Sequence, residues 1–111
     1  MKLTAEDYDH LSVMALRGDL VAEGCDELKR AASERMSRQV RDFVLDLSGL
    51  EFVDSQGLET LVWLQEKVAE DLGQIRLAAP QDNVKKILHM TRLAGRFDTH
   101  DEVEPAIKSL R

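Results

Sequence analysis

The sequence predicts an α/β domain with a small mixed, mainly parallel β-sheet and about four helices packed around it. Short apolar runs typical of strands alternate with segments whose apolar residues recur every three or four positions, as in helices. The 111 residues contain no linker, repeat or low-complexity tract. We therefore expect one domain over residues 1–111.

The first half of the chain predicts two strands, a helix and a buried strand. Residues 11–16 form the first clear strand, closed by a turn at residues 17–19, and residues 2–6 are a weaker candidate for its partner. A helix of about 15 residues follows, because one apolar stripe contains Val21, Cys25, Leu28, Ala32 and Met36. Residues 43–47 suit a strand buried on both faces, and residues 48–54 then connect it to the next helix.

The second half continues the alternation. A helix begins near Ser55 and runs to about Leu72, with Gly73 as a plausible C-cap. Residues 75–78 predict a third strand, which Pro80 stops.

Two further helices and a short strand complete the chain. The third helix is capped by Asp82 or Asn83 and is marked by Val84, Ile87, Leu88 and Thr91. Phe97 falls in a short last strand. The final helix turns inward Val103, Ala106, Ile107 and Leu110, and places Pro105 in its first turn, where proline is tolerated.

Composition excludes several classes of protein. A net charge of −6 disfavours non-specific nucleic-acid binding, and no apolar run approaches the roughly 18 residues of a membrane span. Cys25 is the single cysteine, and the three histidines lack ligand spacing, so we expect no disulfide, metal or cofactor. The N-terminus starts with Met and has no signal-peptide core, which indicates a free-standing cytoplasmic protein without direct membrane insertion.

The most informative segment is Asp54-Ser55-Gln56-Gly57, which opens the second helix after an apolar pair, Phe52 and Val53, that we expect to anchor the loop. Together with the buried strand before it, this segment resembles the STAS domain, the family of bacterial anti-sigma factor antagonists and of sulphate-transporter cytoplasmic domains. The resemblance covers about residues 11–110 and includes the Gly18-Asp19-Leu20 turn and the later Leu93, Phe97 and Ala106-Ile107.

The resemblance implies a phosphorylation-controlled switch. Ser55 occupies the position of the family's regulatory phosphoserine, so the unphosphorylated protein would bind an anti-sigma factor and phosphorylation would release it. The implied partners are a serine kinase of the histidine-kinase-like ATPase type, which can itself be the anti-sigma factor, and a metal-dependent serine phosphatase. Gln56 departs from the pattern, because many relatives carry a second hydroxyl residue there.

Physical reasoning supports such a switch at Ser55. A serine at a helix start is accessible and lies near unpaired backbone N–H groups, and the positive end of the helix accommodates a phosphate. The phosphate adds a charge of about −1.5 to −2 close in sequence to Asp54, Asp46 and Glu51. A partner surface fitted to neutral Ser55 would meet a poorly compensated anion. The competing interpretation is that Ser55 is a plain helix cap.

Other residues have a structural and a functional interpretation. Asp54 either caps the helix or shapes the serine loop for the kinase, and Gly57 gives the backbone room. Trp63 lies opposite the apolar stripe, so it is either an exposed partner contact or a ring covered by the stems of Glu59 and Lys67. Asp46 is expected to bind loop N–H groups beside the serine loop. The predicted partner-binding residues are Asp54, Ser55, Gln56, Gly57, Glu59 and Trp63, with Asp46 and Asp19 in support.

Alternatives to the switch come from different classes of function. The sequence lacks a nucleophile elbow, a phosphate-binding loop and a Gly-x-Gly-x-x-Gly motif, so we do not expect an enzyme. The missing phosphate loop also disfavours a small-ligand or nucleotide sensor. The main alternative is a STAS docking subunit of a membrane transporter complex that is never phosphorylated, with which Gln56 and an exposed Trp63 are compatible.

Overall fold

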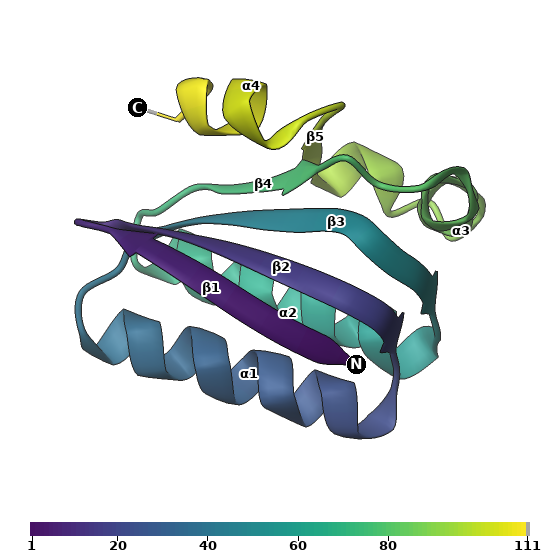
Figure 1. The fold of residues 1–111 in the computed structure, drawn as a ribbon, viewed down its shortest axis with the longest axis horizontal. Coiled ribbons are helices and arrows are strands. Elements are labelled where there is room, and N and C mark those ends of the chain that lie inside the picture. The colour runs from purple at the N-terminus through teal and green to yellow at the C-terminus, as the bar shows by residue number, and fades with distance from the viewer. Residues whose placement is uncertain (111) are drawn as a thin grey trace.

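The computed structural model describes residues 1–110 and contains a five-stranded sheet whose strand order is the chain order (Figure 1). The first strand pairs antiparallel with the second, and every later pair is parallel. The strands are β1 (Lys2–Tyr8), β2 (Leu11–Leu20), β3 (Asp42–Val53), β4 (Ile75–Ala78) and β5 (Asp98–His100). The predicted mixed, mainly parallel α/β architecture is confirmed.

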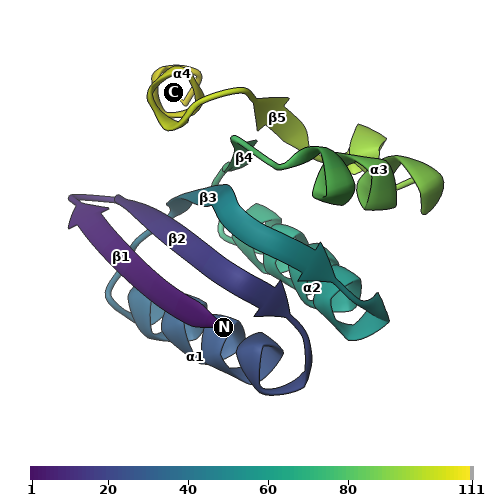
Figure 2. The ribbon, with the colours of Figure 1, turned by 45° about the vertical axis from the view of Figure 1, so that its right-hand side comes forward.

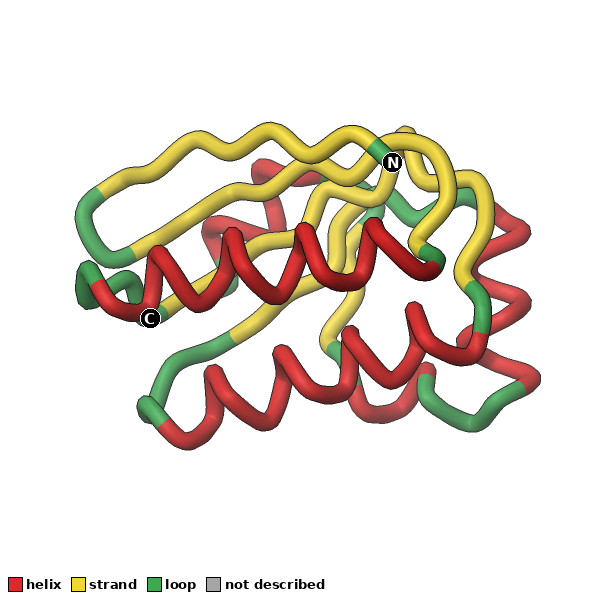
Figure 3. Tube along the Cα trace, turned by 90° about the horizontal axis from the view of Figure 1, so that it is seen from below, coloured by secondary structure: helices red, strands yellow, loops and turns green. Residues whose placement is uncertain are grey.

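Four α-helices and one 3₁₀ turn connect and cover the strands. They are α1 (Ala22–Ser37), α2 (Ser55–Glu70), α3 (Asp82–Met90), η1 (Ala94–Arg96) and α4 (Val103–Lys108). Helices α1 and α2 lie side by side on one face of the sheet, and α4 lies on the opposite face (Figures 1 and 3). None of the helices within residues 1–110 is long and apolar enough to cross a membrane.

The main core lies between the sheet and helices α1 and α2. The predicted stripe of α1 is buried at Cys25, Leu28 and Ala32 and packs against strand residues such as Leu16 and Leu45. A smaller apolar cluster on the other face contains Val44, Ala78 and Ala106. The neighbours Val44 and Leu45 therefore belong to different clusters, which is why β3 reads as a continuous apolar run.

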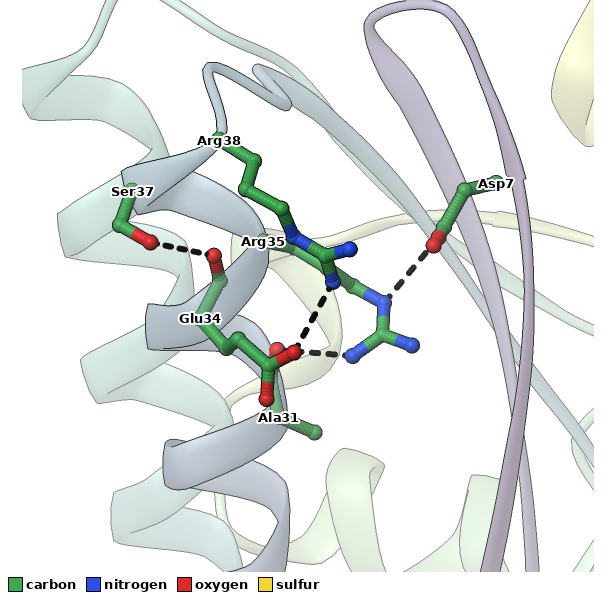
Figure 4. Close-up of polar contacts among 6 residues, drawn as sticks. All are labelled: Asp7, Ala31, Glu34, Arg35, Ser37 and Arg38. Carbon is green, nitrogen blue, oxygen red and sulfur yellow. Dashed lines mark hydrogen bonds and ion pairs between the residues drawn. The ribbon is translucent and has the colours of Figure 1, made fainter.

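The N-terminal hairpin is fixed to α1 by one arginine. A two-residue turn at Asp9 and His10 joins β1 to β2, so the weak prediction of a partner strand is confirmed. Arg35 Nε donates to Asp7 Oδ1 at 3.1 Å and Arg35 Nη1 donates to the Ala31 carbonyl at 3.0 Å (Figure 4). The Ser12 hydroxyl across the ladder and this guanidinium lower the pKa of Asp7. Ser12 Oγ is buried without a well-formed hydrogen bond, so the contact with Arg35 is the better-defined cause.

Two predicted loops are strand in the structure. The expected turn at residues 17–19 is wrong, because Gly18 takes a φ of +97° and lets β2 continue to Leu20 through an irregular ladder. The expected connection at residues 48–54 is also wrong over most of its length, since β3 pairs with β2 as far as Val53. Sequence features of a turn here mark irregularities inside a strand pair.

The helix ends also differ from the predictions. Helix α2 ends at Glu70, and the left-handed position after it is occupied by Leu72, with a φ of 60°, and not by Gly73. Gly73 is needed for another reason, because a Cβ there would lie 2.0 Å from the Arg41 carbonyl oxygen. Both Gly73 and Leu72 donate backbone hydrogen bonds to the last turn of α2, which makes a Schellman ending.

Helix α3 starts without a side-chain cap. Its N-cap residue is Gln81, so the prediction of Asp82 or Asn83 is wrong. The side chains of Gln81 and Asn83 instead donate to the carbonyls of Ser48 and Glu51, each at 2.8 Å, and so attach the start of α3 to β3. Phe97 is buried immediately before the last strand and is not part of it.

Candidate functional site

The predicted site lies at the end of the molecule where β2 passes into α1 and β3 passes into α2 (Figures 1 and 2). Parallel strands bring these two junctions to the same edge of the sheet. The backbone N–H of Asp54 donates to the Leu20 carbonyl at 3.4 Å, so the two junctions are in direct contact. The site is thus built on two strands and two helix starts.

Asp54 is the N-cap of α2. Its Oδ1 accepts a hydrogen bond from the Gly57 backbone N–H at 2.8 Å, and its carbonyl accepts the first helical bond, from Leu58 N at 2.9 Å. Of the two interpretations of Asp54, the structure confirms the cap. The competing interpretation of Ser55 as the cap is wrong, because the neighbouring aspartate performs that role.

Ser55 is therefore the first residue of α2, and it is exposed. Its hydroxyl forms no hydrogen bond to another described residue. The backbone N–H groups of Ser55 and Gln56 have no acceptor within the helix, because they belong to its first turn. An exposed hydroxyl thus lies beside two unpaired donors at the positive end of a helix dipole.

Gly57 is buried and sets how close α2 comes to β2. A Cβ on Gly57 would lie 2.3 Å from the Leu20 carbonyl oxygen and 2.7 Å from Val53 Cγ1. The backbone room predicted for Gly57 is therefore real, and the reason for it is contact with the neighbouring strand. Gly57 is therefore turned toward the core and offers no surface of its own for contact.

A groove between the starts of α1 and α2 runs beside Ser55. Gln56 and Glu59 are exposed on its α2 side, and Thr60 Oγ1 donates to the Gln56 carbonyl at 2.8 Å. The α1 side contributes Ala22, Glu23, Cys25, Asp26 and Lys29. The structure thus brings Ser55 close to Gln56 and Glu59, as the sequence predicted, and adds the first turns of α1 to the same surface.

Trp63 does not match the expectation of an exposed ring. It is half-buried and packs against the main core, and Lys29 Nζ of α1 lies 5.7 Å from the centre of its ring. This separation permits a cation–π contact between the two helices. Cover from Lys29 of α1 was not predicted, and the predicted cover by the stems of Glu59 and Lys67 stays a prediction. Trp63 is therefore a contact between α1 and α2 and not a fully exposed ring.

The two aspartates that were expected to support the site, Asp19 and Asp46, lie in different parts of the structure. Asp19 is exposed at the end of β2, opposite Phe52 of β3, and so belongs to the site. Asp46 Oδ1 accepts from the Ser48 backbone N–H at 3.0 Å, as predicted. However, Asp46 and Val53 are separated by six residues of the same strand, or on the order of 20 Å. The expectation that Asp46 lies beside the serine loop is wrong.

Sequence reasoning missed the exposure of Phe52. The apolar pair was expected to anchor the loop, but only Val53 is buried, whereas Phe52 is 45% exposed. Strand pairing explains the difference, since Val53 pairs with buried Leu20 and Phe52 pairs with exposed Asp19, after a register shift that leaves Glu51 out of the ladder. A simple alternation of faces would not have found this, because the buried residues Leu47, Leu50 and Val53 are three positions apart.

The site carries a concentrated negative charge. Five exposed carboxylates line this groove and a neighbouring hollow at the same end of the molecule, those of Asp19, Glu23, Asp26, Glu51 and Glu59. None of the five forms an ion pair with another side chain of residues 1–110, whereas Lys29 is the one cation that lines the groove. Among the same residues, no group of three or more His, Cys, Asp or Glu side chains is placed to hold a metal ion.

Comparison with known proteins identifies the fold family. The model of the family described as "Mlab, STAS domain" matches residues 4–103. The chain belongs to the STAS domain family. The match includes the whole of the site, from Asp19 at the end of β2 to Trp63 on α2.

Relatives of this STAS chain are described as anti-sigma factor antagonists. BtrV of Bordetella bronchiseptica is 21% identical over the full chain and 96% of its own length. A Thermotoga maritima structure described in the same terms superposes with a TM-score of 0.90 at 20% identity, over 98% of this chain and 94% of the other. SpoIIAA has been solved unphosphorylated, with a TM-score of 0.86 at 19% identity, over 97% of this chain and 95% of the other, and also phosphorylated.

The fold is shared with a transporter family as well. A sulfate transporter family protein from Wolinella succinogenes superposes with a TM-score of 0.79 at 16% identity, over 90% of this chain and 84% of the other. The fold is thus found both among regulators and in a transporter family.

Proposed function

We propose that this STAS protein is a partner-switching regulator of the anti-sigma factor antagonist type. In its unphosphorylated form it binds an anti-sigma factor that is a serine kinase of the histidine-kinase-like ATPase type. Phosphorylation of Ser55 releases that partner, and a metal-dependent serine phosphatase restores the binding form. The relatives described as anti-sigma factor antagonists and the two phosphorylation states of SpoIIAA support this proposal.

The observation that carries the proposal is the separation of roles between Asp54 and Ser55. Asp54 caps the helix by accepting from the Gly57 N–H, and the exposed Ser55 hydroxyl forms no hydrogen bond with the other described residues. A kinase can therefore modify Ser55 without removing a cap. The free N–H groups of the first turn stabilise the phosphate, so the domain stays folded when modified.

Release follows from the surroundings of Ser55. A phosphate adds about −1.5 to −2 charges to a surface that already carries five unpaired carboxylates. A partner whose cations match the existing carboxylates has none left for the additional anion, which is then buried unpaired at the interface. The loss of even about 3 kcal/mol weakens binding more than a hundredfold.

Binding of two variants tests the proposal. Ser55→Ala should bind the anti-sigma factor kinases of the source organism constitutively, and Ser55→Asp should not bind them. Phosphopeptide mass spectrometry on protein from growing and stressed cells should find phosphate on Ser55 whose occupancy changes with condition. Equal affinity of the two variants, together with an unmodified Ser55 in every condition, contradicts the proposal.

A docking subunit of a membrane transporter is the second candidate. The match to a sulfate transporter family protein and the absence of a second hydroxyl at Gln56 favour it. In that case the protein should co-purify with a transporter ATPase, and Ser55→Ala and Ser55→Asp should bind that subunit equally.

A further inference from the structure

An exposed aromatic side chain lies three residues before the proposed switch. Phe52 is 45% exposed although it is the penultimate residue of a strand that is largely buried. It precedes Ser55 by three residues, so the two Cα atoms are at most about 11 Å apart. A partner interface of ordinary size centred on Ser55 is wide enough to reach Phe52 as well.

The neighbours of Phe52 are acidic. Asp19 pairs with Phe52 across the β2–β3 ladder, and Glu51 precedes it in the chain. Both carboxylates are exposed, and neither is paired with a cation of residues 1–110. A second hollow, lined by Met1, Asp19, Glu23 and Glu51, continues this surface toward α1. One apolar ring is thus set in a rim of unpaired negative charge.

We infer that Phe52 is the apolar anchor of the partner interface, and that the partner receives it in an apolar pocket rimmed by Lys or Arg side chains. The inference rests on the proposed function and names the chemistry of the partner surface. Interfaces concentrate their binding energy in a few central aromatic residues surrounded by a polar rim. Phe52 with Asp19 and Glu51 has that arrangement.

Charge excludes two other occupants of this surface. A second copy of the chain would bring its own five carboxylates against these five, which opposes self-association through this face. An anionic lipid surface is repelled for the same reason. A protein with basic side chains around an apolar pocket would bury the Phe52 ring in that pocket and pair its cations with the carboxylates of Asp19 and Glu51.

Replacement of the ring tests the anchor. Phe52→Ser should weaken binding of the purified anti-sigma factor kinases of the source organism by about 30-fold or more, as measured by titration calorimetry. The matched control is Tyr8→Ser, because Tyr8 is 52% exposed at the far end of the hairpin. The control should bind as the wild type does. Thermal unfolding of both variants establishes that the domain remains folded.

Neutralisation of the rim tests the charge of the partner. Wild-type affinity should fall as salt concentration rises, and the double variant Asp19→Asn with Glu51→Gln should bind more weakly and show a shallower salt dependence. An unchanged salt dependence overturns the basic rim.

The possible outcomes separate this inference from the proposed function. If wild type binds, Ser55→Asp does not, and folded Phe52→Ser binds as tightly as wild type, the anchor is wrong and the switch stands. If Ser55→Ala and Ser55→Asp bind alike while Phe52→Ser loses binding, the switch is wrong and the anchor stands. Failure of the wild type to bind any such kinase overturns both.

Discussion

Gly57 and the Leu20 carbonyl oxygen are in such close contact that a Cβ on residue 57 would lie 2.3 Å from that oxygen. The atom that obstructs the methyl group is backbone, so it cannot move aside as a flexible side chain would. The distance between α2 and β2 at the site is therefore set by the absence of a side chain.

Gly57→Ala should destabilise the protein by about 1–3 kcal/mol, because α2 must shift away from β2. Urea unfolding of the variant measures this loss. The matched control is Gly95→Ala, since a Cβ on Gly95 meets nothing within 4 Å and the residue has no positive φ. If the two variants lose the same stability, the contact with Leu20 is not the cause.

Asp54→Ala should cost about 1 kcal/mol of folding free energy, because the Gly57 N–H loses its acceptor. Ser55→Ala should change stability by less than about 0.5 kcal/mol, since the Ser55 hydroxyl forms no hydrogen bond within residues 1–110. Thermal unfolding of the two variants side by side distinguishes the cap from the exposed hydroxyl. A larger loss for Ser55→Ala would reverse the assignment.

Leu72→Gly should stabilise the protein by about 1 kcal/mol. Leu72 has a φ of 60°, a conformation that costs a residue with a Cβ roughly that amount, and its side chain is 87% exposed, so little packing is lost. Chemical denaturation measures the gain. Leu72→Ala keeps the Cβ and should give no such gain, which separates backbone strain from removal of an exposed apolar group.

The Asp7–Arg35 contact should make stability depend on pH at the acid end. The pKa of Asp7 is below its ordinary value of 3.8 in the folded protein, so the unfolded chain binds its proton first as pH falls. The stabilisation is present above pH 3.8 and is lost as pH falls through the folded value. Asp7 is partly exposed, so the contribution is about 0.5 kcal/mol or less.

Comparison with Asp7→Asn isolates this contribution. Wild type should be slightly more stable than the variant at neutral pH, and the difference should shrink as Asp7 becomes protonated. Equilibrium denaturation at a series of pH values follows the two curves. A constant difference across the acid range would show that the carboxylate charge is not responsible.

The periodicity of apolar residues correctly predicted the helices and strands that pack against the apolar core. The stripe through Cys25, Leu28 and Ala32 and the run through Val44 and Leu45 are both buried as expected, because burial of apolar surface dominates those segments. The expected position of Ser55 at a helix start also predicted its exposure, which is confirmed. These parts follow from information that is local in the chain.

Features that depend on contacts between residues far apart in the chain could not be predicted from the sequence. From the sequence alone Gly18 was predicted to lie in a turn, but it lies in β2 because β3 continues beside it. Phe52 was predicted to be buried, but it lies on the exposed face of β3. The position of Trp63 on its own helix predicted a surface residue, and the contact with Lys29 of α1 could not be read from that helix alone. In each case a neighbour far away in the sequence decides the environment.

The strand order of the sheet, which equals the chain order, bears on how the protein forms during synthesis. Each strand pairs with the one made just before it, and none has to insert between two strands that are already paired. The strands β1, β2 and β3 with the helices α1 and α2 therefore emerge from the ribosome before β4 does. The surface around Ser55, built entirely from these first elements, can form before the C-terminal third of the chain has emerged.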